Sequence, residues 1–172
     1  MKRALFAFCL LCSLTASAQT TEEKVSKLCF SVDIEAGPCV EKNLDCKAAI
    51  GASAILDYQF THIFSAGLGM NINQHLTKKS ENMFFIPIFA DAKVNFTRSK
   101  VSPFLDMRVG CSFIRSTSLY LSPALGVEYK LNEKSHLQCA LSYTMQAPDG
   151  KDSFPSRGYS CNNLTIRFGY GF

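Results

Sequence analysis

The sequence predicts an all-β fold, an eight-stranded antiparallel up-and-down transmembrane β-barrel. Apolar residues recur at every second position through eight segments, as expected of strands with one apolar face. The charged residues of these segments all lie on the opposite faces. The connections are short after even-numbered segments and mostly longer after odd-numbered ones, which is typical of a meander whose two ends face different compartments.

Each predicted strand is a run in which one period-two register holds from end to end. The apolar faces carry no charge, whereas most polar faces carry one or two. A lipid-facing Lys or Arg costs about 2–4 kcal/mol near the middle of a bilayer, so a membrane barrel requires this segregation. In chain order, the predicted strands and the charges on their polar faces are 29–36 (Asp33, Glu35), 48–60 (Asp57), 64–72 (none), 84–96 (Asp91, Lys93), 103–113 (Asp106, Arg108), 119–131 (Glu128, Lys130), 136–145 (none, with His136) and 164–172 (Arg167).

Two prolines and the connections complete this outline. Pro87 and Pro123 fall inside the fourth and sixth strands. Because proline has no amide donor for the strand ladder, they predict bulges or a shifted register there. The predicted connections are 37–47, 61–63, 73–83, 97–102, 114–118, 132–135 and 146–163.

Alternation alone fits either a membrane barrel or a secreted soluble barrel or sandwich. Eight strands enclose only a packed file of side chains, too little room for the many Phe, Leu, Ile, Met and Tyr residues of the apolar faces. The polar faces are rich in Gly, Ala and Ser, which suit a crowded lumen better than a solvated surface. About ten residues per strand, tilted by about 40°, rise roughly 25 Å, the height of a membrane's apolar band. The sequence therefore favours lipid outside and the polar faces inside.

The first 18 residues have the pattern of a secretory signal peptide. Two basic residues precede an apolar stretch over 4–14, and a small-residue cleavage site ends at Ala18. An uncleaved membrane anchor is the alternative, but the apolar stretch is shorter than the roughly 20 residues of a spanning helix. We expect cleavage near Ala18, a short periplasmic segment over 19–28 and a barrel domain over 29–172.

The composition of the mature chain limits its partners. The 172 residues less the 18 of the signal leave 154, enough for one domain. Removing the two basic residues of the signal lowers the formal net charge from +4 to +2, which gives no reason to expect nucleic acid binding. We expect no cofactor and no metal, outer-membrane lipid around the barrel, and a monomer.

Two long stretches carry a family resemblance. Residues 84–113 (FFIPIFADAKVNFTRSKVSPFLDMRVGCSF) and 119–131 (LYLSPALGVEYKL) resemble the small outer-membrane β-barrel proteins common in Bacteroidetes, within the wider OmpA/OmpX-like superfamily. The resemblance covers nearly the whole mature chain and implies the outer membrane of a Gram-negative bacterium. In that family, a last strand ending in Phe resembles the signal read by the outer-membrane assembly machinery. The matching positions here are Leu164, Ile166, Phe168, Tyr170 and Phe172.

The charges of the polar faces are expected to gather in the lumen. If the N-terminus and the short turns are periplasmic, most of them fall in the half of the lumen near the short turns. We expect those on three consecutive strands to form a salt-bridged plug, since charges in a narrow lumen must be paired. A proton or ion path is the alternative. The cluster comprises Asp57, Asp91, Lys93, Asp106, Arg108, Glu128, Lys130 and His136, and the plug is expected of Asp91, Lys93, Asp106, Arg108, Glu128 and Lys130.

Cysteines suggest one disulfide. Cys39 and Cys46 lie in the first outer connection of an exported protein, so we expect a disulfide between them. Cys161, near the start of the last strand, competes for either partner. The cysteines are not clustered along the chain, which argues against a metal site. The others, expected as small hydrophobic side chains on the lipid face or at the base of the first strand, are Cys111, Cys139 and Cys29.

The pattern favours a structural or surface-interaction role and no enzymatic activity. Residues 146–163 mix Gly, Pro, charge and aromatics, and present either a variable loop or a contact surface for an extracellular ligand. A narrow porin-like channel for small or apolar solutes is one alternative. A lipid-modifying enzyme is another, because His75 lies in a predicted outer connection near Ser80 and Glu81.

Overall fold

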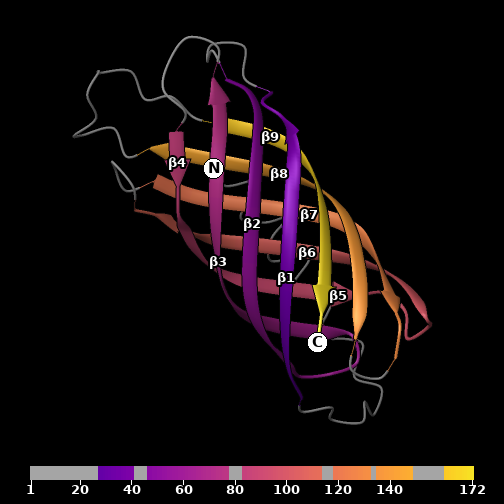
Figure 1. The fold of residues 1–172 in the computed structure, drawn as a ribbon. Coiled ribbons are helices and arrows are strands. Elements are labelled where there is room, and N and C mark those ends of the chain that lie inside the picture. The colour runs from indigo at the N-terminus through magenta and orange to yellow at the C-terminus, as the bar shows by residue number, and fades with distance from the viewer. Residues whose placement is uncertain (1–26, 41–45, 78–82, 114–117, 133–134, 149–160) are drawn as a thin grey trace, which may run out of the picture.

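The protein folds as a closed barrel of antiparallel strands (Figure 1). The computed structural model describes residues 27–40, 46–77, 83–113, 118–132, 135–148 and 161–172. The predicted signal peptide and residues 19–26 lie outside the described residues. No helix within the described ranges is long and apolar enough to cross a membrane.

The barrel has eight strands, and one of them is divided into two segments. The fourth strand is interrupted at Ile86, which gives β4 and β5, and both segments pair with β3. Sequential strands pair, and β9 returns to β1 to close the wall. The predicted eight-stranded antiparallel barrel is therefore confirmed. The strands are β1 (Lys27–Pro38), β2 (Cys46–Gln59), β3 (Phe64–Thr77), β4 (Met83–Phe85), β5 (Pro87–Asn95), β6 (Val101–Ser112), β7 (Ser118–Lys130), β8 (His136–Pro148) and β9 (Cys161–Gly171).

The prolines interrupt the ladder without shifting it, so the expected bulges or register shifts are wrong. Phe85 in β4 and Ile88 in β5 keep one common register against β3 on either side of the break at Ile86. Pro123 lies opposite Met107 of β6 in an unbroken register. Against β8, pairing stops beside Pro123 and resumes in the same register. A missing amide donor thus removes hydrogen bonds, while the neighbouring pairs hold the alignment.

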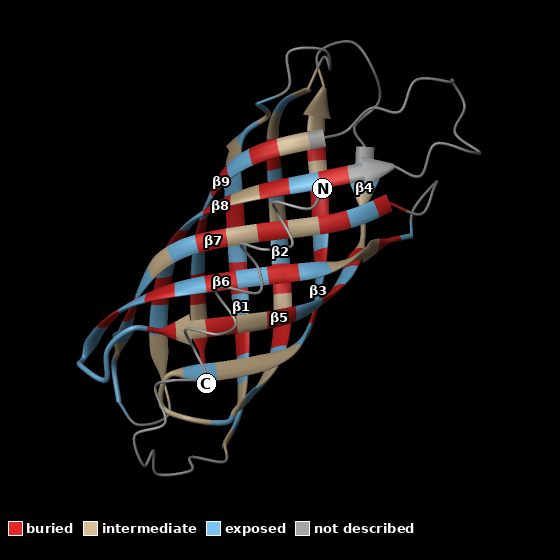
Figure 2. Cartoon of the chain, turned by 180° about the vertical axis from the view of Figure 1, so that it is seen from behind, coloured by how far each residue is buried: buried red, intermediate tan, exposed pale blue. Residues whose placement is uncertain are grey.

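The two faces of the wall differ in polarity as the alternation predicts. Figure 2 shows exposed and buried positions alternating along the strands. Large apolar side chains, among them Ile34, Leu68 and Leu125, cover the outside of the barrel, and polar side chains are buried inside. So wide an exposed apolar surface is characteristic of contact with lipid rather than water.

Three turns lie at one end of the barrel, the short-turn end, and four connections lie at the other. We call the latter the long-loop end because it holds the two longest connections, between β1 and β2 and between β8 and β9. The short-turn end joins β2 to β3, β5 to β6 and β7 to β8, and it also carries the start of β1 and the end of β9. Aromatic rings gather outside this end, as in the aromatic girdles of membrane barrels. The paired rings are Tyr58–Phe60, Phe60–Phe64, Phe30–Phe172 and Tyr170–Phe172.

At the long-loop end, the strands reach further than the alternation predicts. β3 continues to Thr77, and β8 and β9 take up both ends of the connection predicted over 146–163. In these extensions the outward positions include polar side chains such as Gln74. Alternation weakens there because polar side chains also occur on the outward face, so the sequence pattern ends before the strand does.

Candidate functional site: a charged lumen

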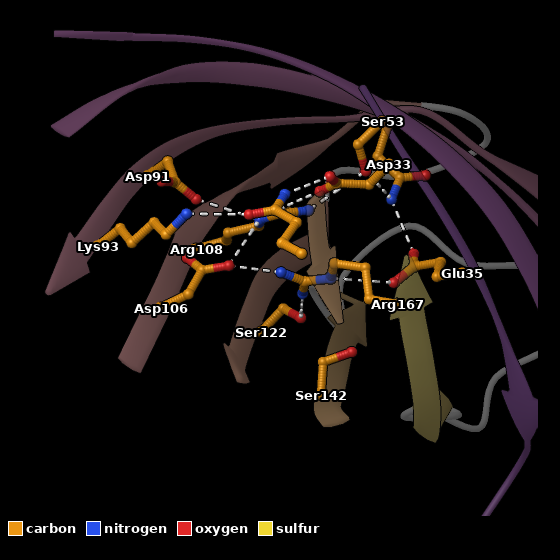
Figure 3. Close-up of polar contacts among 12 residues, drawn as sticks. Asp33, Glu35, Ser53, Asp91, Lys93, Asp106, Arg108, Ser122, Ser142 and Arg167 are labelled. Atoms are coloured by element: carbon orange, nitrogen blue, oxygen red, sulfur yellow. Dashed lines mark hydrogen bonds and ion pairs between the residues drawn. The ribbon is translucent and has the colours of Figure 1, made fainter. Parts of the chain in front are cut away.

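Period-two alternation points charged side chains from several strands into the lumen, where they meet across the barrel (Figure 3). Arg108 of β6 is almost wholly buried. Its Nη2 donates to Asp33 Oδ2 of β1 at 2.5 Å and its Nε donates to Asp91 Oδ1 of β5 at 3.1 Å. A further hydrogen bond joins Nη1 to Ser53 Oγ at 3.3 Å. The Arg108 guanidinium therefore connects β6 to three other strands, β1, β2 and β5.

Arg167 of β9 forms a second centre beside Arg108. Its Nη1 donates to Asp106 Oδ2 at 2.5 Å, and its Nη2 donates to Ser122 Oγ at 3.0 Å. Its Nε lies 3.8 Å from Glu35 Oε2. Asp106 Oδ2 is also 3.4 Å from Arg108 Nε, so the two guanidinium groups share a carboxylate. Burial makes this sharing favourable, because an unpaired charge would be costly in a closed lumen.

A second tier of the network lies toward the short-turn end. Lys93 Nζ of β5 donates to Glu128 Oε2 at 2.6 Å and to Gln138 Oε1 at 3.0 Å. Gln138 Nε2 in turn donates to Asp33 Oδ1 at 2.5 Å and so joins the two tiers. His136 Nε2 lies 3.9 Å from Glu128 Oε2. We call the two tiers together the lumen network; its charged members are Asp33, Glu35, Asp91, Lys93, Asp106, Arg108, Glu128 and Arg167.

The remaining predicted cluster residues line a cavity at the short-turn mouth. This cavity has a volume of about 390 Å³ and reaches inward to Lys93 and Glu128. Asp57 and Lys130 belong to its wall, together with the thiol-bearing Cys29. Of the six residues expected in the plug, five therefore join the lumen network, and Lys130 lies at the mouth.

Three members of the lumen network were missing from the predicted cluster: Asp33, Glu35 and Arg167. The sequence pattern places all three on polar faces, which is the signal that they enter the lumen. Their position along the barrel axis cannot be predicted from the sequence pattern. In a barrel of tilted, staggered strands, residues at different distances from the turns can lie at the same level along that axis.

The long-loop half of the lumen is polar but mostly uncharged. Ser122 Oγ and Thr144 Oγ1 are 2.9 Å apart, and the buried ring of Tyr120 stacks on Phe89 at 5.6 Å. Phe89 has room because its neighbour is Gly69: a Cβ there would lie 2.5 Å from the Phe89 ring. Beyond the mouth cavity, side chains of the charged tiers and of this neutral half pack against one another inside the barrel.

The structure places His75 inside the barrel, not in an outer loop. The residue lies in β3 and its side chain is wholly buried. Ser80 and Glu81, its predicted neighbours in an enzyme site, lie outside the described residues. Cys39 and Cys46 form a disulfide, and Cys46 Sγ lies 3.9 Å from His75 Nδ1.

Four of the five predicted assembly-signal residues lie on β9, which closes the barrel against β1 and β8, and the fifth, Phe172, directly follows it. Of these five residues, Tyr170 is half-buried and the others are exposed on the outside of the barrel. The backbone amide of Phe172 donates to Phe30 O at 2.8 Å, so the chain's last residue continues the pairing.

A closed antiparallel barrel with an apolar exterior and a charged interior has the fold of small outer-membrane β-barrel proteins. The chain is similar in structure to Neisserial surface protein A, with a TM-score of 0.64 and 15% identity, over 86% of this chain and 98% of that one. It is also similar to the Escherichia coli outer membrane protein W, with a TM-score of 0.56 and 12% identity, over 87% and 98% of the two chains. No protein-family model and no curated protein sequence matches it.

Proposed function

We propose that this protein resides in the outer membrane as a barrel closed to ions, and that it acts as a structural or surface-interaction protein through its long connections. The observation that carries the proposal is the lumen network, which links β1, β5, β6, β7 and β9 across the interior. A structural neighbour is itself called a surface protein.

Charge pairing explains why this network obstructs the lumen. Arg108 and Arg167 are buried and each contacts carboxylates from other strands. An ion crossing the lumen would have to separate these contacts in a region of low dielectric constant, where breaking a buried pair is costly. We therefore expect no open-channel current at rest.

Planar-bilayer recording of the purified, refolded protein tests the closed lumen. The wild-type barrel is expected to give no steady single-channel current. Arg108→Ala removes the group that joins Asp33, Asp91 and Ser53, and we expect it to produce channel openings. Acidic side chains outnumber basic ones in the remaining lumen, so these openings are expected to favour cations.

Lys130→Ala is the matched control, since it also removes one cation but from the mouth. It is expected to stay silent. Steady current from the wild-type protein would overturn the closed-lumen proposal. Silence from a correctly folded Arg108→Ala barrel would mean that the lumen network is not what obstructs the lumen.

A narrow channel is the second candidate, and the mouth cavity favours it. About 390 Å³ of space opens at the short-turn end and stops at the Lys93–Glu128 pair. If the ion pairs of the lumen network separate, this cavity becomes the entrance of a channel. The recordings on wild-type protein decide between the two candidates.

We further propose that the chain is a member of the small Bacteroidetes barrels of the OmpA/OmpX-like superfamily, on the stretches 84–113 and 119–131. Outer-membrane lipid and the assembly machinery are then its partners, and an extracellular ligand would bind at the long connections. We propose no enzymatic role and a monomeric state.

A further inference from the structure

Three metal-ligating side chains meet at the long-loop end, outside the lumen network. Cys39 follows β1, Cys46 begins β2 and His75 lies near the end of β3. The two Sγ atoms and a ring nitrogen of His75 all lie within 4.8 Å of one another. The cysteines are joined as a disulfide, with their Cα atoms 5.9 Å apart. These residues are separated in the sequence, and the pairing of β1, β2 and β3 brings them together. The sequence alone therefore does not indicate the cluster.

We propose that Cys39, Cys46 and His75 form a redox-gated metal site, which binds a zinc-like ion when the disulfide is reduced. Two thiolates and one imidazole are ligands that Zn²⁺ prefers. A tetrahedral ion with bonds of about 2.3 Å to sulfur and about 2.0 Å to nitrogen would set sulfur and nitrogen roughly 3.6 Å apart. Cys46 Sγ and His75 Nδ1 are 3.9 Å apart, close to this spacing, and reduction of the disulfide frees the two sulfur atoms to move apart around the ion.

The two states of the site interconvert by thiol–disulfide exchange. A low-molecular-weight dithiol donates two electrons and two protons, so the Cys39–Cys46 bond breaks, two thiols form and the dithiol becomes a disulfide. Zn²⁺ then displaces both thiol protons and leaves one coordination position open. Outside the cell the disulfide is the favoured form, so metal binding requires a reducing environment.

Asn163 supports two of the three ligands. Its backbone pairs with that of Cys39, and its side-chain Nδ2 lies 3.4 Å from His75 Nε2. Asn163 Oδ1 is buried and lacks a hydrogen-bond partner among the described residues. Turning the amide by 180° lets His75 Nε2–H donate to Oδ1. The lone pair of Nδ1 then faces Cys46, as a metal-bound imidazole requires.

The wall of the barrel fixes the imidazole in this position. The His75 side chain is wholly buried, and its ring packs against Phe85 with 5.0 Å between the ring centroids. Because β3 is paired on both sides here, with β2 and with β4, the ring is held before any metal arrives. A ligand side chain that is already ordered lowers the conformational entropy cost of metal binding.

Zinc binding by the refolded full-length barrel tests the proposal. The protein is reduced with a phosphine, freed of reductant under nitrogen and dialysed against Zn²⁺, and bound zinc is measured by elemental analysis. We expect one Zn²⁺ per reduced barrel and none per oxidised barrel. Co²⁺ in place of Zn²⁺ is expected to give the visible absorption of a tetrahedral thiolate site.

Variants separate this site from other thiols. Cys39→Ser with Cys46→Ser is expected to abolish zinc binding, and His75→Gln to weaken it at least tenfold. Cys111→Ser with Cys139→Ser, which removes two thiols from elsewhere on the barrel, is expected to bind as wild type. Equal zinc in the reduced and oxidised wild-type barrels would overturn the site without using any variant. Wild-type affinity in His75→Gln would also overturn it.

Discussion

The side chain of Arg167 shows how much one buried residue contributes to the lumen. It pairs with Asp106, donates to Ser122 and lies near Glu35. Arg167→Ala leaves these carboxylates short of a buried counter-charge. Removing one partner of a buried pair typically costs about 3–5 kcal/mol, so the free energy of unfolding is expected to fall by that amount. Urea unfolding in detergent micelles measures it.

Lys130→Ala is the matched substitution for this measurement. Lys130 is half-buried at the mouth cavity, where solvent screens its charge. We expect a loss of no more than about 1 kcal/mol, as for exposed ion pairs. Equal losses in Arg167→Ala and Lys130→Ala would mean that burial of the lumen network does not determine its contribution to stability.

Polarity predicts which residues enter the lumen, but not which of them meet. Asp33 and Arg167 have the right parity in the sequence, yet their partners Arg108 and Asp106 lie on strands that do not neighbour theirs. Such pairs depend on strand tilt and stagger, which a period of two residues does not encode.

Among the elements, β3 shows where sequence patterning stops. Its predicted end is residue 72, but the strand continues to Thr77 and carries His75 into the barrel. Alternation reports a difference in medium between two faces. Past the apolar band both media are polar, so strand pairing continues without that signal. The cluster of His75 with Cys39 and Cys46 was therefore beyond reach from the sequence.

The last strand, β9, is where the assembly proposal is tested. Phe172 is 52% exposed and stacks on Phe30. If the assembly machinery reads the final aromatic, Phe172→Ser is expected to reduce the folded barrel in cells several-fold. The same variant is expected to refold in detergent, because most pairing of β9 is untouched. Gel mobility of unboiled and boiled membrane fractions measures both.

Phe113→Ser is the control for the assembly measurement. Phe113 is a similarly exposed phenylalanine, 62% accessible, but it follows β6 at the long-loop end. It is expected to assemble at the wild-type level. If both variants reach the membrane equally well, the terminal aromatic is not a recognition element.

At the scale of the whole molecule, one polarity rule accounts for the barrel. Eight strands close with apolar residues outside, and the enclosed space is too small to hold charges apart. Pairing of the buried charges follows from closure, and closure follows from β9 meeting β1. The fold was predictable because every strand shows the same alternation of apolar and polar residues. The contacts inside the barrel depend on the tilt and register of all the strands, which that alternation does not give.

The outer wall provides the last prediction, at Leu125 in the middle of β7. Leu125 is 61% exposed and lies between Leu105 and Leu141 on the neighbouring strands. If this surface faces lipid, Leu125→Arg is expected to lower the free energy of unfolding in lipid vesicles by about 2–4 kcal/mol. Leu131→Arg, just past β7 at the short-turn end, is expected to cost only about 0–1 kcal/mol. Equal, small effects at both positions would mean that the wall meets water, because only a bilayer makes the cost of a charge depend on its depth.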